Sequence, residues 1–173
     1  MLKDASQPLS DISGSKFHKR TYRCFGEFFS DQLFLMKNLR QVFRIMSGKV
    51  IPGAFRERLM LAVVSVYGCR YCSWAHTREA LRSGVAKDEI ANLLAGSVDN
   101  CPEDETVAVL YAQHWADSDM NPTAEAYSRL EETYGTEKAE AINLVLRMNR
   151  LGNLAGNTWD RFLYRVSLGK FGG

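Results

Sequence analysis

Two cysteines and a histidine stand close together near the middle of the chain, in the run CRYCSWAH that begins at Cys69. Residues three and four positions apart share one face of a helix, so Cys69, Cys72 and His76 fall in one row. A thiolate attacks peroxides and disulfides, and both a helix N-terminus and a neighbouring base lower the pKa of a thiol. The spacing predicts a redox site with Cys72 as the reactive thiol, Cys69 as its disulfide partner and His76 as the base.

A carboxylate from the preceding segment is expected to complete this site. Gly68 ends a predicted helix over 54–67, and the next helix is predicted to start near Cys69. If the chain turns there into an antiparallel helix pair, Glu57 and His76 lie roughly 15 and 12 Å from the turn at the α-helical rise. A carboxylate facing an imidazole fixes its tautomer and raises its basicity. We therefore expect Glu57 to orient His76.

Zinc binding is an alternative interpretation of the same residues, because two thiolates, an imidazole and a carboxylate make an acceptable tetrahedral set. Two observations argue against zinc. The two cysteines and the histidine lie at the start of one helix and point along one face, and no second pair of possible ligands follows in the sequence. We expect no bound metal. The other two cysteines, Cys24 and Cys101, have no partner pattern and are expected to be small packed residues.

The elements that must position these residues are predicted to be helices only. Apolar residues recur at spacings of three and four, and no stretch shows the alternation typical of a strand. Glycine and proline mark the breaks between helices. The helices are predicted over 26–47, 54–67, 69–82, 87–94, 102–116, 124–134, 137–151 and 157–167.

The chain is expected to form an all-α, single-domain bundle of about seven to eight helices. Its 173 residues, 46% of them hydrophobic, suffice for one core. Residues 1–21 are predicted to be a polar arm that orders only against a partner surface. Residues 22–173 form the domain, with the Cys-x-x-Cys core at 53–96. In 149–157, asparagines and glycines repeat every four residues, a pattern that favours close helix packing over substrate contact.

The overall composition argues against several classes of protein. The 22 Lys and Arg residues are interspersed with 20 Asp and Glu residues, so no basic stripe indicates nucleic-acid binding. The longest apolar run, 59–66, is too short for a membrane span. The N-terminus lacks the apolar region of a secretory signal, so a cytoplasmic location is expected. No dinucleotide fingerprint is present, and we expect no NAD, flavin or other cofactor.

Glu57 followed by Cys69-x-x-Cys72-x-x-x-His76 resembles the alkylhydroperoxidase D-like branch of the carboxymuconolactone decarboxylase superfamily. The resemblance covers 55–94, and 149–153 with 158–160 is similar to the C-terminal helix of peroxidase-related members. It implies a peroxidatic Cys72, a resolving Cys69 and a proton relay of Glu57 and His76. It also implies an all-helical bundle that assembles as a trimer or hexamer. One departure is Tyr71, because the best-studied members carry a second histidine at that position.

The resemblance implies a thiol-dependent peroxidase that reduces organic hydroperoxides and takes electrons from an external dithiol or lipoyl-type reductant. A thiol-disulfide oxidoreductase or redox sensor that acts on a protein partner is an alternative. A lyase of the carboxymuconolactone decarboxylase type is a weaker alternative, because that chemistry leaves the two thiols unexplained.

Overall fold

The computed structural model describes residues 17–172, and every regular element in that span is a helix. The all-α prediction is confirmed, and the number of helices within 17–172 agrees with the expected seven to eight. Residues 1–16, most of the predicted arm, lie outside the described residues. The helices are α1 (Phe25–Lys37), α2 (Leu39–Met46), α3 (Gly53–Tyr67), α4 (Arg70–Arg82), α5 (Lys87–Leu94), α6 (Glu103–Asp117), α7 (Ala124–Tyr134) and α8 (Thr136–Val166).

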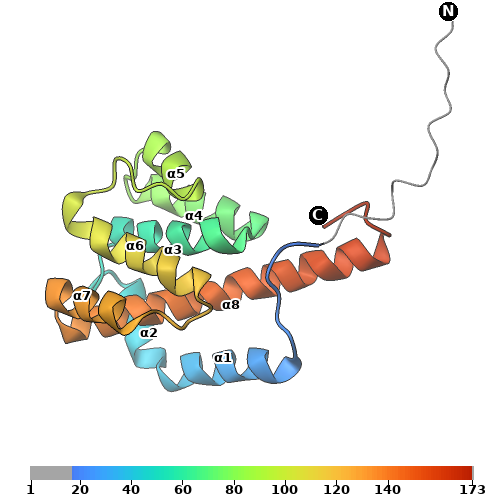
Figure 1. Cartoon of the computed structure of the whole chain (residues 1–173), viewed down its shortest axis with the longest axis horizontal. Helices are drawn as coiled ribbons and strands as arrows, with labels where there is room; N and C mark the ends of the chain where they lie inside the picture. The colour runs from blue at the N-terminus through green and yellow to red at the C-terminus, as the bar shows by residue number, and fades with distance from the viewer. Residues whose placement is uncertain (1–16, 173) are drawn as a thin grey trace, which may run out of the picture.

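Helix α3 is the centre of the bundle. It contacts α4, α5, α6 and α8, which surround it in Figure 1. A helix that is apolar on every side must be buried, and the second half of α3 has this composition. Its first turns also bury three charged side chains, Arg56, Glu57 and Arg58. Arg58 is paired with Glu89 and Glu105, and the other two belong to the site described below.

Two predicted helix boundaries are wrong. The helix predicted over 26–47 is interrupted at Asn38, whose side-chain Nδ2 donates to the carbonyl of Phe34 at 2.8 Å. An asparagine that bonds to nearby backbone competes with the helical pattern, which accounts for the break. The helices predicted over 137–151 and 157–167 form one helix of 31 residues, α8, which runs through Gly152 and Gly156 without interruption.

Three buried asparagines explain why α8 continues through its glycines. Asn149 Nδ2 donates to the carbonyl of Met60 at 2.6 Å, and Asn157 Nδ2 donates to the carbonyl of Tyr67 at 2.8 Å. Asn153 Nδ2 donates to Asn149 Oδ1 at 2.9 Å. The bonds of Asn149 and Asn157 hold α8 along α3, and the bond of Asn153 orients Asn149 within α8. These tertiary contacts outweigh the weak helix propensity of glycine. They support the packing interpretation of the asparagine and glycine repeat.

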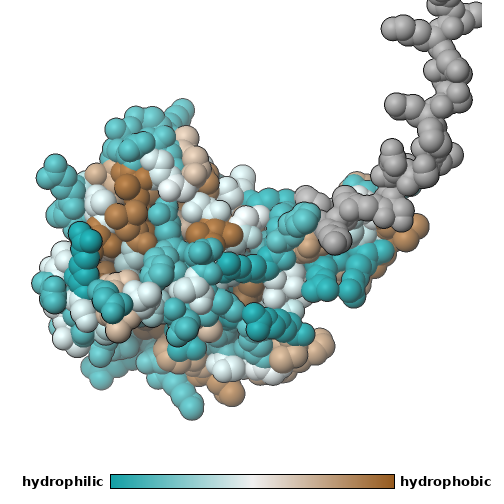
Figure 2. Space-filling view, in the orientation of Figure 1, coloured by the Kyte–Doolittle hydropathy of each residue, from teal (hydrophilic) through white to brown (hydrophobic). Residues whose placement is uncertain are grey.

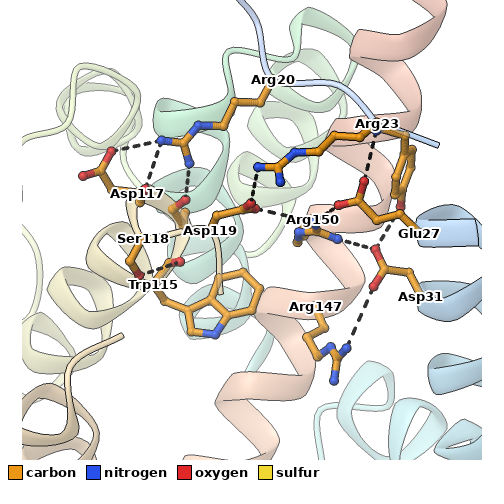
Figure 3. Close-up of polar contacts among 12 residues, drawn as sticks. Arg20, Arg23, Glu27, Asp31, Trp115, Asp117, Ser118, Asp119, Arg147 and Arg150 are labelled. Atoms are coloured by element: carbon orange, nitrogen blue, oxygen red, sulfur yellow. Dashed lines mark hydrogen bonds and ion pairs between the residues drawn. The ribbon is translucent and has the colours of Figure 1, made fainter. Parts of the chain in front are cut away.

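A buried arginine joins α8 to the N-terminal part of the described chain (Figure 3). Arg150 is 1% exposed; it bonds to Glu27 at 2.6 Å, pairs with Asp31, and lies 3.5 Å from Asp119. Tyr22 also donates to Asp31, at 3.1 Å. A buried charge left without its partners is strongly destabilising, so this cluster holds α1 firmly on α8.

The described end of the predicted arm lies against the chain itself. Arg20 donates to the carbonyl of Ala116 at 2.6 Å, and its own carbonyl accepts from Asn157 at 3.0 Å. In Figure 1 this segment crosses α8 on its way to α1, and the end of α8 extends beyond the other helices. None of the helices within 17–172 combines the length and apolar character needed to cross a membrane.

Candidate active site

The turn between α3 and α4 brings the two halves of the site together. Gly68 takes a left-handed conformation with φ 66°, and its N–H donates to the carbonyl of Val64 at 2.8 Å. Glycine adopts this conformation without the steric cost that a Cβ would impose. Cys69 then caps α4, because its Sγ accepts from the N–H of Cys72 at 3.3 Å. The chain thus forms the antiparallel pair of helices expected from the sequence.

Glu57 and His76 face each other across this pair. Glu57 is 2% exposed, and its Oε2 lies 2.9 Å from Nδ1 of His76. Its Oε1 accepts from Arg56 Nε at 3.1 Å, and Arg56 in turn donates to the carbonyl of Met46. Because a carboxylate only accepts, Nδ1 of His76 carries the hydrogen, and in the neutral ring Nε2 keeps a free lone pair. The contacts leave His76 oriented as a proton acceptor.

The two thiols of α4 are in direct contact. Their sulfur atoms lie 2.6 Å apart, and both cysteines are free. The hydrogen bond with Cys72 lowers the pKa of Cys69 to about 6, helped by the N–H groups of Cys72 and Tyr71 and opposed by burial and by the charge of Asp160. The same hydrogen bond, burial and the Cys69 charge raise the pKa of Cys72. Of the two, Cys69 therefore holds the negative charge in the reduced pair.

Only one of these thiols reaches the cavity beside the histidine. Cys72 is partly exposed and lines a cavity of about 400 Å³ together with His76 and Glu57, whereas Cys69 is 0% exposed. Asn149 of α8 is also on the cavity wall. The rest of the lining combines the charged Arg56 and Glu79 with an apolar wall formed by Met46, Met60, Ala75, Met148 and Gly152. One thiol and one proton acceptor therefore line the same small cavity.

Arg56 and Asp160 are polar contacts of the site that sequence reasoning missed. Arg56 precedes Glu57 directly, and adjacent helix residues do not ordinarily face each other, so the spacing gave no signal for their contact. Asp160 lies on α8 and accepts from the hydroxyl of Tyr71 at 2.9 Å. Tyr71 is therefore held toward α8 and is not part of the cavity lining.

The predictions about the other two cysteines have different outcomes. Cys101 packs against the core as expected, but Cys24 is exposed at the start of α1, so the packing prediction is wrong there. The sequence pattern could not reveal this, because an apolar periodicity does not show which helical face lacks a neighbour. Within 17–172, no three His, Cys, Asp or Glu side chains are grouped in a way that would hold a metal ion.

Gly156 allows α8 to approach the buried thiol closely. A Cβ at Gly156 would lie 2.7 Å from Cys69 Sγ, whereas a Cβ at Gly152 would meet nothing within 4 Å. Overpacking of this kind costs about 1–3 kcal/mol, and alanine gains about 1 kcal/mol over glycine in a helix. We expect Gly156→Ala to lower the free energy of unfolding relative to Gly152→Ala by about 2 kcal/mol, measured by urea denaturation. Equal unfolding curves for the two variants would contradict the close approach.

The sequence comparisons concern this same region. A family model for the carboxymuconolactone decarboxylase family matches residues 36–113, from the end of α1 into α6. Glu57, Cys69, Cys72 and His76 all fall within the match. No curated protein and no solved structure matches the chain. Residues 36–113 are therefore similar to the carboxymuconolactone decarboxylase family.

Proposed function

We propose that the protein is a thiol-dependent peroxidase that reduces organic hydroperoxides through Cys69 and Cys72. The observation that carries this proposal is that the two thiols have different surroundings. Cys72 lines the cavity with His76, whereas the buried Cys69 contacts Cys72 from behind at 2.6 Å. The apolar wall of the cavity suits the alkyl group of an organic hydroperoxide.

The first step is the reduction of the peroxide. Nε2 of His76 accepts the proton of Cys72, and Glu57 stabilises the imidazolium that forms. Because the charge on Cys69 keeps the pKa of Cys72 raised, the Cys72 sulfur loses its proton to His76 only as it attacks the terminal oxygen of the hydroperoxide, and the O–O bond breaks. The alkoxide leaves with the proton from His76 as an alcohol, and Cys72 becomes a sulfenic acid. One peroxide is reduced by two electrons, and Cys72 is oxidised by two.

The second step uses the charge on Cys69. The Cys69 thiolate attacks the sulfur of the Cys72 sulfenic acid, the S–O bond breaks, and hydroxide leaves and is protonated to water. The product is an intramolecular disulfide. An external dithiol or lipoyl-type reductant then restores both thiols by exchange and leaves as a disulfide itself. A thiol pKa of about 6 makes Cys69 suitable for this resolving role.

The proposal is tested by reacting the reduced protein with a stoichiometric alkyl hydroperoxide and mapping the products by mass spectrometry. The expected products are one Cys69–Cys72 disulfide and one equivalent of alcohol per chain. Cys24 and Cys101 stay reduced. Survival of both thiols at 69 and 72 in folded protein would refute the peroxidase function.

A second candidate is thiol-disulfide exchange with a protein partner. The arrangement of the two thiols favours it, because exchange needs one accessible sulfur, here Cys72, and a second thiol in contact with it, here Cys69, to release the partner. The two functions are distinguished by steady-state turnover. A peroxidase consumes hydroperoxide at a rate proportional to protein concentration while reductant lasts, whereas an exchange protein does not.

The charge of the reduced pair should depend on pH. A depressed Cys69 pKa leaves the thiolate populated above about pH 6, and the thiolate is lost as the pH falls through that value. The ultraviolet absorbance of the thiolate, followed as the reduced protein is titrated, should therefore change with a midpoint near pH 6, and this change should be missing in Cys69→Ser. A midpoint near the usual thiol pKa would contradict the assigned charge on Cys69.

An exposed apolar face beside the site indicates self-association. Large apolar side chains on one face of α1 and α2 are each 48–84% exposed, and the face ends at Met46, which lines the cavity. Figure 2 shows hydrophobic side chains along the lower edge of the molecule, where α1 lies. The residues of this face are Phe25, Phe29, Leu33, Met36, Leu39, Phe43 and Met46.

We infer that a second copy of the chain covers this face. At roughly 150–250 Å² per large side chain, its exposed area is on the order of 800 Å², the area each partner buries in a stable interface. We expect the wild-type protein to be a trimer or hexamer and Phe29→Glu to be smaller, as measured by light scattering. Leu110→Glu, at an exposed site on α6, is the control and should leave the mass unchanged. A monomeric wild-type chain would show that another occupant covers the face.

A further inference from the structure

Asp160 is a buried carboxylate that the proposed reaction does not use. It is 0% exposed and lies on α8 one turn after Gly156, the residue that packs against Cys69. Its Oδ1 accepts from Tyr71 at 2.9 Å and from Arg70 at 2.8 Å. Its Oδ2 accepts from Lys19 at 3.2 Å. Three donors from two other parts of the chain therefore converge on one buried charge.

These contacts fix the end of α4 that carries the thiols. Arg70 is the first residue of α4, and its guanidinium also stacks over the ring of Tyr71, 4.9 Å from the ring centre. Both residues lie between Cys69 and Cys72 in the sequence. A buried carboxylate is costly unless hydrogen bonds compensate it, and here two of the compensating donors lie between the two cysteines. The position of the pair against α8 is thus tied to the charge of Asp160.

We propose that Asp160 is a positioning residue that sets the redox balance of the Cys69–Cys72 pair. Acting from α8, it anchors Arg70 and Tyr71 and favours the uncharged disulfide over the charged, reduced pair. The inference rests on the proposed function only in taking Cys69 and Cys72 to form a disulfide. It assigns a role in the reaction to a residue 88 positions beyond Cys72 in the sequence.

The direction of the effect follows from the charges of the two states. The reduced pair holds a negative charge on Cys69, and the disulfide holds none. A nearby carboxylate therefore raises the free energy of the reduced pair only. Its charge raises the pKa of Cys69, against the larger lowering by the hydrogen bond with Cys72. Lys19 and Arg70 offset part of the Asp160 charge, so removing either cation should strengthen its effect.

The experiment is a redox titration of the whole chain with dithiothreitol. Each protein disulfide takes two electrons and one proton from one dithiothreitol, which closes to its cyclic disulfide; the second proton goes to the solvent because Cys69 stays a thiolate. The fraction of Cys69–Cys72 disulfide is measured by mass spectrometry after acid trapping. We expect Asp160→Asn to shift the equilibrium about tenfold toward the reduced pair, which is about 30 mV for a two-electron couple. Asp117→Asn is the control, since Asp117 is an exposed partner of Arg20, and should not shift it.

Lys19→Gln separates the charge effect from a merely structural one. The Lys19 side chain is 23% exposed and that of Asp160 0%, so replacing Lys19 is compatible with folding even where Asp160→Asn is not. It removes a cation from Asp160 and should shift the equilibrium the opposite way, toward the disulfide. Shifts of the same sign for both variants, or none beyond that of Asp117→Asn, overturn the role of Asp160. If the wild-type pair forms no disulfide at any ratio of dithiothreitol forms, the proposed function fails with it.

Discussion

Cys72→Ser is expected to abolish peroxide-driven disulfide formation and to lower the rate of hydroperoxide consumption by roughly three orders of magnitude or more. The reason is chemical, because a serine hydroxyl stays protonated where a thiol can ionise. Cys72 is also the member of the thiol pair that lines the cavity with His76. The measurement is a steady-state assay with an alkyl hydroperoxide and a dithiol reductant.

Two further variants show whether the loss belongs to the proposed nucleophile. Cys101→Ser changes a half-buried thiol whose pKa is raised by burial, and it should keep the wild-type rate. Cys69→Ser should still reduce one equivalent of peroxide, but it should stop at a sulfenic acid on Cys72 that a dimedone probe traps. Sulfenic acid on Cys69 in the Cys72→Ser variant would reverse the two assigned roles. A Cys72→Ser variant that keeps lactone decarboxylase activity would support the lyase alternative.

The local part of the site could be predicted from the sequence because helix geometry determines it. The three- and four-residue spacings put Cys69, Cys72 and His76 on one side of α4. A glycine at the turn suffices to bring Glu57 back to His76, 2.9 Å away. Distances within one helix or one tight helix pair follow from the rise per residue, which varies little between proteins.

The parts that could not be predicted depend on contacts between distant segments. Nothing in the sequence around Tyr71 indicates that its hydroxyl bonds to Asp160, 89 residues further on. The continuity of α8 depends likewise on bonds from Asn149 and Asn157 to carbonyls of α3. The division of charge between the thiols depends on the hydrogen bond between them, on burial and on the N–H groups that surround Cys69. Sequence spacing contains neither kind of information.

Glu57→Gln is expected to lower the rate of peroxide reduction roughly 10²–10⁴-fold, the range found when general acid–base catalysis is lost. The amide cannot stabilise a positive His76, so the proton of Cys72 has no favourable acceptor. Glu79→Gln is the matched control, because Glu79 lines the same cavity but pairs with Arg82 at the surface. Since Arg56 loses its anionic partner, the folded fraction must be measured by circular dichroism alongside the rate.

A double-mutant cycle decides whether Glu57 acts through His76 or independently of it. If the two form one relay, His76→Asn alone should cost about as much as Glu57→Gln, and the double variant should cost little more than either. Additive losses would mean that Glu57 contributes only by keeping Arg56 and the start of α3 in place. Because the 2.9 Å contact joins Oε2 to Nδ1, and Arg56 occupies the other oxygen, the geometry favours the non-additive result.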